Sequence, residues 1–122
     1  MGDFMSYDKL EVWVSSRKLT NKVYSLSKLF PKEEVYGLTS QLRRCAVSVP
    51  SNIAEGVGRN HRKDSLQFFY IARGSLFELE TQLYIAFDQN YIEESVLKNI
   101  LDDVVACKKL LNGFINYYKS KI

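Results

Sequence analysis

The densest group of positively charged side chains in the sequence follows two closely spaced glycines. Arg59, Arg62 and Lys63 flank His61 there, and an Arg-Arg pair lies in the segment before them. Guanidinium and ammonium groups neutralise the phosphates of nucleic acids. A short run of charge is equally typical of a solvated loop, and His61 is interpreted as a loop residue. The candidate nucleic-acid-binding residues are Arg43, Arg44, Arg59, His61, Arg62 and Lys63, to which Arg17 and Lys18 add charge if the fold brings them near.

A line of polar side chains follows one side of the segment before this basic group. Helical spacing aligns Gln41, Arg44, Ser48, Ser51, Asn52 and Glu55. The line can form a hydrogen-bond network that fixes helix register, which we favour, or a polar pocket or subunit contact. Because Arg44 and Glu55 lie about 16 Å apart along the axis, each needs another partner. We expect those partners to be Arg73 or Glu80.

A catalytic interpretation of the same region needs an acid–base pair drawn from Glu55, Glu78 and Glu80. The sequence supplies no nucleophile, metal-ligand set or phosphate loop beside them. Two unclustered cysteines and one histidine fall short of the four ligands that zinc requires. The glycines of Gly56-Val57-Gly58 follow a helical segment rather than a strand, so they make no dinucleotide fingerprint. The sequence therefore predicts a protein without catalytic residues, metal or cofactor.

Length and composition are those of one ordinary domain. The 122 residues fit a single domain, 1–122, and fractions of 46% hydrophobic and 25% charged residues are average for globular proteins. Charges interrupt the apolar stretches before the roughly 20 residues that span a bilayer, and residues 1–7 lack a secretory signal. Cys45 and Cys107 stand alone inside helical patterns, which favours a reducing, cytoplasmic setting. The net charge of +3 is a weak hint of acidic partners.

Four amphipathic helices must position these residues. Apolar side chains recur at helical spacing over residues 8–30, 32–58, 64–89 and 92–119, and no segment alternates convincingly as a strand does. The predicted inner faces hold Val12, Leu19, Val23, Leu26 and Phe30 in the first helix, Leu38, Leu42, Cys45, Val49 and Ile53 in the second, and Ile100, Val104, Cys107, Leu111, Phe114 and Tyr118 in the fourth. Rods of matched length with short loops predict an all-α, antiparallel up-down-up-down four-helix bundle.

Proline and glycine punctuate these helices. Phe30-Pro31 is expected to end the first helix, and Gly56 and Gly58 the second. Pro50 lies in the middle of the second helix, where it removes one backbone hydrogen bond and should produce a kink. The freed carbonyl groups are expected to bond Ser48, Ser51 and Asn52. Asn90-Tyr91 forms the predicted turn into the last helix.

The third helix carries apolar residues on two nearly opposite stripes. One stripe holds Leu66, Phe69, Tyr70, Leu76, Phe77, Tyr84 and Phe87, and the other holds Phe68, Ile71, Ala72, Leu79 and Ala86. A helix in a four-helix bundle buries one face and exposes the other. The second stripe therefore predicts an exposed apolar patch that packs against another subunit. The alternative is that the first and fourth helices cover both stripes.

Two segments resemble a known bacterial family. They are Leu38-Thr-Ser-Gln-Leu-Arg-Arg-Cys-Ala-Val-Ser-Val-Pro-Ser-Asn-Ile-Ala-Glu-Gly56 with Gly58-Arg59, and Ile71-Ala-Arg-Gly-Ser-Leu-Phe-Glu-Leu-Glu-Thr-Gln-Leu83. Both are similar to the four-helix-bundle proteins encoded in intervening sequences of 23S ribosomal RNA genes, sometimes called ribosomal proteins. Leu10-Glu-Val-Trp13 and Phe30-Pro31 also fit, so the likeness covers almost the whole chain. Cys45 departs from the alanine that such proteins tend to carry.

The resemblance implies a bundle assembled into a homopentameric ring. It also implies kinship with the accessory protein of diversity-generating retroelements, a five-membered barrel of similar bundles thought to engage nucleic acid and reverse transcriptase. No defined catalytic activity comes with the family, so no catalytic residue can be transferred. The candidates for an oligomer interface or structural network are Arg44, Asn52, Glu55, Phe68, Ile71, Arg73, Ser75, Glu78 and Leu79.

The leading hypothesis is a cytoplasmic, non-catalytic homo-oligomer that binds RNA or DNA through basic patches repeated on each subunit. The alternative is a scaffold that recruits a protein partner, such as a polymerase, through aromatic helix surfaces. An enzyme that uses Glu55 or Glu78 with Arg73 is the weakest of the three hypotheses.

Overall fold

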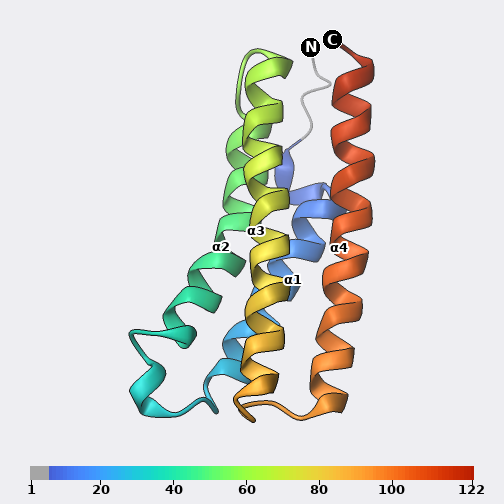
Figure 1. Ribbon diagram of the computed structural model, residues 1–122. Helices are drawn as coiled ribbons and strands as arrows, with labels where there is room; N and C mark the ends of the chain where they lie inside the picture. Colours follow the sequence, from blue (N-terminus) through green and yellow to red (C-terminus); the bar gives the residue numbers. More distant parts are fainter. Residues whose placement is uncertain (1–5) are drawn as a thin grey trace.

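Four long helices account for most of the chain in the computed structural model, which describes residues 6–122 (Figure 1). The long helices are α1 (Glu11–Ser27), α2 (Leu38–Val57), α3 (Arg62–Asp88) and α4 (Glu94–Ser120), with short 3-10 turns η1 (Tyr7–Lys9) and η2 (Lys32–Glu34). Over residues 6–122 the structure contains no strand. The prediction that residues 1–7 lack a secretory signal falls largely outside the described residues.

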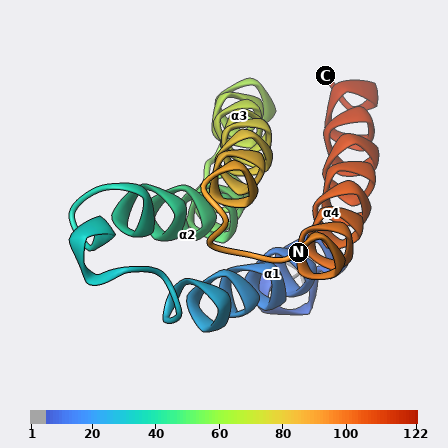
Figure 2. The same cartoon turned by 60° about the horizontal axis from the view of Figure 1, so that its bottom comes forward.

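The helices pack in chain order around the bundle, each against the next and α4 against α1. Figure 2 shows this order from below, with the connection between α1 and α2 extending beyond the bundle on one side. The connection between α2 and α3 lies at the same end as the last turn of α4 (Figure 1). The predicted all-α up-down-up-down bundle is confirmed.

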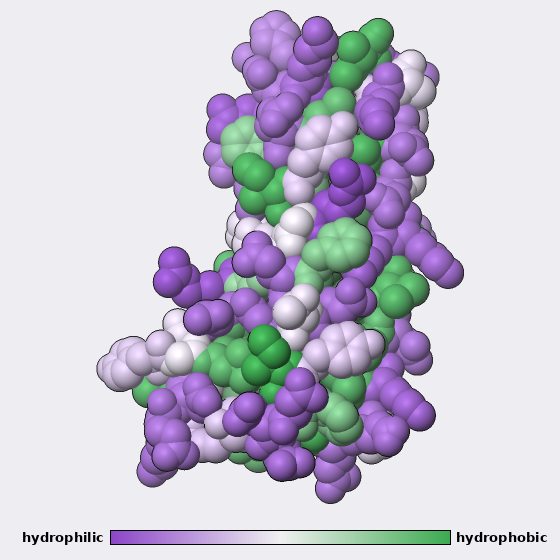
Figure 3. Space-filling view, in the orientation of Figure 1, coloured by the Kyte–Doolittle hydropathy of each residue, from purple (hydrophilic) through white to green (hydrophobic). Residues whose placement is uncertain are grey.

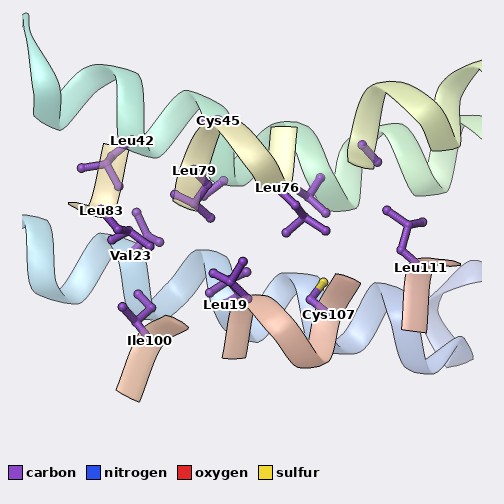
Figure 4. Packing of buried hydrophobic residues seen from close by; sticks show 14 of the residues in the cluster. Leu19, Val23, Leu42, Cys45, Leu76, Leu79, Leu83, Ile100, Cys107 and Leu111 are labelled. Atoms are coloured by element: carbon purple, nitrogen blue, oxygen red, sulfur yellow. The ribbon is translucent and has the colours of Figure 1, made fainter. Parts of the chain in front are cut away.

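The core is the apolar interior shared by all four helices (Figure 4). The predicted inner faces of α1, α2 and α4 are confirmed, with Leu26, Leu38, Phe114 and Tyr118 packed at the margin rather than fully enclosed. Cys45 and Cys107 are buried free thiols. Burial raises the pKa of both to about 11, because a thiolate there would lose its hydration. The cysteines therefore behave as small core residues.

The buried face of α3 runs between the two predicted stripes rather than along either one. Steps of seven residues place Phe69, Leu76 and Leu83 on one line, and Ala72, Leu79 and Ala86 on the next line, and both lines face the core. The prediction that the two stripes lie on nearly opposite sides of α3 was therefore wrong, because the inner residues of both stripes are buried on one face. The side chains left exposed are Ile71, Phe77, Tyr84 and Ile85.

Helix α2 begins six residues later than predicted, at Leu38 instead of Lys32. The chain first makes the turn η2, and the Glu34 carboxylate then accepts a hydrogen bond of 3.0 Å from the backbone N–H of Leu38. The Tyr91 hydroxyl, in the α3–α4 turn, donates to the same carboxylate at 2.7 Å. Both donors lower the pKa of Glu34, the backbone N–H more than the phenol. These contacts join the start of α2 to the turn between α3 and α4.

Pro50 lies inside α2, and the helix continues through it. Because proline has no N–H, the carbonyl group four residues earlier, at Ala46, loses its helical partner. The Thr20 hydroxyl on α1 donates to this carbonyl at 3.0 Å, and also lies 2.8 Å from the Ser16 carbonyl. The predicted role of Ser48, Ser51 and Asn52 was therefore wrong at this carbonyl, because a neighbouring helix supplies the hydroxyl.

Two backbone features position the ends of α2 and α3. Gly56 is buried in the last turn of α2, where an added Cβ would lie 2.5 Å from a ring carbon of Phe69 and 3.0 Å from the Ser65 carbonyl. Its lack of a side chain allows α3 to cross closely. Asn90 adopts a left-handed φ of 64°, and the N–H groups of Asn90 and Tyr91 bond the carbonyls of Phe87 and Ala86. This Schellman turn ends α3 at the predicted place.

Candidate nucleic-acid interface

The connection between α2 and α3 and the last turns of α4 bring their basic residues to one end of the bundle. Helix α2 stops at Val57, and α3 starts at Arg62 with His61 as its N-cap. Lys121 and Ile122 line a shallow hollow together with residues 60–64. We call this surface the basic end: it comprises Arg59, His61, Arg62, Lys63, Lys119 and Lys121, all exposed.

Three of the cations at or beside the basic end lie over aromatic rings. The guanidinium of Arg59 is 4.4 Å from the centre of the Phe68 ring, and that of Arg62 is 5.7 Å from the Tyr118 ring. The Lys121 ammonium is 5.3 Å from the ring of Tyr117, which is 53% exposed. Such contacts hold a cation in place while leaving part of its charge accessible. Positive charge beside an exposed ring is also the arrangement that binds unpaired bases and their phosphates.

The charge of the basic end is only partly neutralised within the chain. Arg59 forms an ion pair of 2.8 Å with Glu55, one helical turn away, and both side chains are about half exposed. Asp64 lines the same hollow as Arg62 and Lys63. Counted over the basic end and these two carboxylates, the cations remain in excess. The surface is therefore positive, and because its ion pair is exposed to solvent, that pair is weak.

Arg43 and Arg44 do not join the basic end, contrary to the single cluster expected from the sequence. They precede Arg59 by about 22–24 Å along α2. Arg43 donates from Nε to the Ser27 hydroxyl at 2.9 Å and lies 4.8 Å from the Tyr24 ring centre, so it bridges α1 and α2. Arg44 is exposed beside Arg43, and both residues line one shallow hollow. The expected cluster rested on proximity along the chain, but the rigid helix α2 keeps Arg43 and Arg44 apart from Arg59.

Arg17 and Lys18 also lie away from the basic end. The Arg17 guanidinium is 5.4 Å from the ring centre of Trp13 on its own helix. Lys18 lines hollows between α1 and α4. The expected addition of these two charges to the cluster was therefore wrong.

Residues 8–113 match the model of the 23S rRNA-intervening sequence protein family. The chain belongs to this family. Its structure is similar to the crystal structure of a protein of unknown function from the S23 ribosomal protein family of Bacteroides thetaiotaomicron, with 25% sequence identity and a TM-score of 0.78. The similarity covers 85% of this chain and 97% of that one. No curated protein matches the chain.

The motif through which the chain resembles other 23S rRNA-intervening sequence proteins lies at the contact between α2 and α3. The Ser75 hydroxyl donates to the Ser48 hydroxyl at 2.9 Å, and the Asn52 amide donates to the Ser48 hydroxyl and carbonyl at 2.9 and 2.8 Å. The Cys45 thiol donates to the Ser75 carbonyl at 3.0 Å. Asn52 and Ser75, two of the candidate residues, thus belong to a hydrogen-bond network that joins the two helices.

The remaining polar candidates in this intervening-sequence protein do not converge. Glu55 pairs with Arg59, whereas the Arg73 guanidinium meets the Asn112 side chain at 3.2 Å and lies over the Tyr70 ring. Glu80 pairs with Lys108 at 2.9 Å. The expected pairing of Glu55 or Arg44 with Arg73 or Glu80 was therefore wrong, because α4 supplies the partners of α3. Glu78 is exposed, Leu79 is a core residue, and Phe68 is half-buried under Arg59.

The sequence interpretation missed Tyr117, Tyr118, Lys119 and Lys121 as members of this site. In an up-down-up-down bundle, the second connection and the end of the fourth helix lie at the same end, so the predicted topology already contained the signal. Among the described residues, no three His, Cys, Asp or Glu side chains gather as a metal site requires. No helix in residues 6–122 is both long and apolar enough to cross a membrane.

Proposed function

We propose that this 23S rRNA-intervening sequence protein is a non-catalytic, self-assembling helical bundle whose basic end binds RNA in the cytoplasm. One observation carries the proposal: two chain segments about sixty residues apart deliver cations and aromatic rings to one end of the bundle. Cations bind RNA phosphates, and an exposed ring such as Tyr117 offers a stacking surface for a base. The family takes its name from intervening sequences of 23S rRNA, and this genomic setting makes RNA the first nucleic acid to test.

Self-assembly would strengthen this binding. One subunit carries a net charge of only +3, which is modest for a protein that binds nucleic acid. When subunits share one orientation, their basic ends lie together and contact several phosphates of one RNA. Two buried free thiols are compatible with the reducing cytoplasm.

The test of the proposal is charge reversal at the basic end. The triple variant Arg59→Glu, Arg62→Glu and Lys63→Glu should lose retention on RNA, and its log-affinity should depend less steeply on log salt by about 2–3 units. The matched control, Lys28→Glu, Lys32→Glu and Lys98→Glu, makes the same charge change at exposed positions away from this end and should affect RNA retention far less. Equal losses in both variants would mean that only net charge matters. Unchanged RNA retention in the first variant would refute the proposal.

The second candidate function is a scaffold that recruits a polypeptide, and the exposed rings of Phe77 and Tyr84 favour it. Pull-down from cell extract after nuclease treatment separates the two functions. A protein partner that survives nuclease treatment and depends on these rings supports the scaffold. Loss of all partners on nuclease treatment supports RNA binding.

A further inference from the structure

The outward side of α3 is an apolar face that the chain itself leaves uncovered. Ile71, Phe77, Tyr84 and Ile85 are 51%, 53%, 49% and 41% exposed. Figure 3, in which α3 runs down the front, shows pale and green side chains along this side between purple margins. Isolated exposed apolar residues are common on proteins, whereas a continuous row along one helix marks a contact surface. We call these four residues, with Gly74 and Thr81, the α3 outer face.

Small residues lie at the centre of the α3 outer face. Gly74 and Thr81 are seven residues apart, so they lie nearly in line along the helix, between the aromatic rings and the isoleucines. A Cβ added to Gly74 would meet nothing within 4 Å, so no contact inside the subunit explains the glycine. An exposed glycine inside a helix costs about 1 kcal/mol relative to alanine. Gly74 leaves room for the backbone of a second subunit to approach at this point.

A groove between α1 and α4 is a second surface at which apolar side chains are incompletely covered. It consists of two hollows along α1, the first lined by Val14, Leu19, Ala106 and Leu110, and the second lined by Leu26, Leu29, Val96 and Ile100. Lys18 and Lys22 line both hollows and mark the boundary between them. Leu29 and Val96 are 84% and 40% exposed at the edge of the second hollow, whereas Leu19 and Ile100 are buried at the base of the groove.

The two surfaces agree in length and spacing. The α3 outer face from Ile71 to Ile85 spans about 21 Å, and the α1 side of the groove from Val14 to Leu26 spans about 18 Å. The rings of Phe77 and Tyr84 start about 10 Å apart along α3, and the centres of the two hollows are about 9 Å apart along α1. Exposed Glu78 borders the α3 outer face, and Lys18 borders the groove, so the margins can form an ion pair.

We propose that the α3 outer face of one subunit packs into the α1–α4 groove of the next. This pairing rests on the proposed self-assembly and names the surfaces that produce it. Helices α1 and α3 are diagonal in the bundle, so each subunit offers both surfaces at once and contacts two neighbours. A head-to-tail contact of this kind forms a ring when its rotation closes.

Cysteine cross-linking tests the pairing on the full chain. The native thiols are buried, with a pKa raised to about 11, so maleimides leave them largely unmodified. The variant Thr81→Cys places a thiol on the α3 outer face, and Asn21→Cys places one in the second hollow. With a short bis-maleimide, the double variant should form a ladder of dimers, trimers and larger species, whereas each single variant should remain uncross-linked.

Each other result overturns the pairing in a distinct way. Dimers from Thr81→Cys alone would mean that α3 pairs with α3. A double variant without a ladder, in an assembly whose mass by light scattering exceeds one subunit, would place the interface elsewhere and leave self-assembly standing. A mass near 14.1 kDa, that of one subunit, would exclude both the pairing and self-assembly. RNA retention, measured separately on the wild-type chain, tests the basic end whichever result is found.

Charge exchange at the margins provides an independent measurement. Glu78→Lys should bring two lysines together across the contact and raise the concentration at which subunits separate by about threefold to tenfold. Adding Lys18→Glu should restore an ion pair with the charges exchanged, and the concentration at which subunits separate should return most of the way to its original value. Circular dichroism and thermal unfolding of each variant at one concentration check that the subunit remains folded. A double variant that is as weak as the sum of its single variants would contradict the pairing.

Discussion

Helix α2 packs against its neighbours through different side chains from those that join α1 to α4. Specific contacts hold α2 against both neighbouring helices: Gly56 admits the Phe69 ring of α3, the Thr20 hydroxyl of α1 donates to the Ala46 carbonyl, and the Ser75 hydroxyl of α3 donates to the Ser48 hydroxyl. Across α1 and α4, the Lys22 ammonium meets the Asp103 carboxylate and the Asn99 side chain near the surface, beside two open hollows. Small and hydroxyl side chains let helices approach closely, whereas long charged side chains keep them apart. The contact between α1 and α4 is therefore the more open of the two.

The substitution Gly56→Ala, at the contact between α2 and α3, should lower the stability of the protein the most. The added methyl group meets a ring carbon of Phe69 at 2.5 Å and the rigid Ser65 carbonyl at 3.0 Å, so α2 and α3 must separate. We expect a loss of about 1–3 kcal/mol in the free energy of unfolding, measured by urea titration. Gly113→Ala is the matched control, because nothing lies within 4 Å of its Cβ, and it should stabilise by up to about 1 kcal/mol. Similar effects at both glycines would show that α2 and α3 are not closely packed.

The substitution Thr20→Val tests the hydroxyl that compensates for Pro50. Valine has nearly the same shape but leaves the Ala46 carbonyl without this donor in a buried site. The free energy of unfolding should fall by about 1–2 kcal/mol. Pro50→Ala restores a backbone N–H, so Thr20→Val should cost less in that background. Equal costs with and without Pro50 would show that the threonine does not compensate for the proline.

The contact between Glu34 and Tyr91 should appear in the pH dependence of stability. Hydrogen bonds from the Leu38 N–H and the Tyr91 hydroxyl lower the pKa of Glu34 below its ordinary value of 4.5. The folded state therefore gains stability above pH 4.5 and loses it as pH falls through the lowered pKa. Tyr91→Phe removes one donor, so the difference in urea midpoint between about pH 7 and about pH 3 should shrink. An unchanged difference would exclude the tyrosine as a source of the pKa shift.

The substitution Lys22→Ala should have the smallest effect. Its ion pair with Asp103 is exposed, with side chains 49% and 38% accessible, so salt and water screen it. We expect a change of no more than about 0.5 kcal/mol in the free energy of unfolding, and a smaller one at high salt. A loss as large as that of Gly56→Ala would mean that the two contacts are held equally firmly.

The sequence determined the number, type and order of the helices, because apolar spacing such as Ile100, Val104, Cys107 and Leu111 satisfies only one face of a helix. It also identified the segment from residue 59 to residue 63 as basic, and it placed Ser48 and Asn52 in one polar line that favours a structural hydrogen-bond network. These features depend on residues close along the chain or repeated at helical spacing. Physical forces between neighbours in sequence suffice to predict them.

Only the tertiary structure decided which of these residues meet. Periodicity divided α3 into two stripes, but packing against α2 and α4 selected the line between them, so Leu79 became core and Ile71 remained exposed. Rigid helices separated Arg43 and Arg44 from Arg59, and the antiparallel topology brought Lys121 and Tyr117 to the basic end. The partner of the Ala46 carbonyl also came from another helix. Contacts between residues distant in sequence depend on how whole helices pack, which no local pattern specifies.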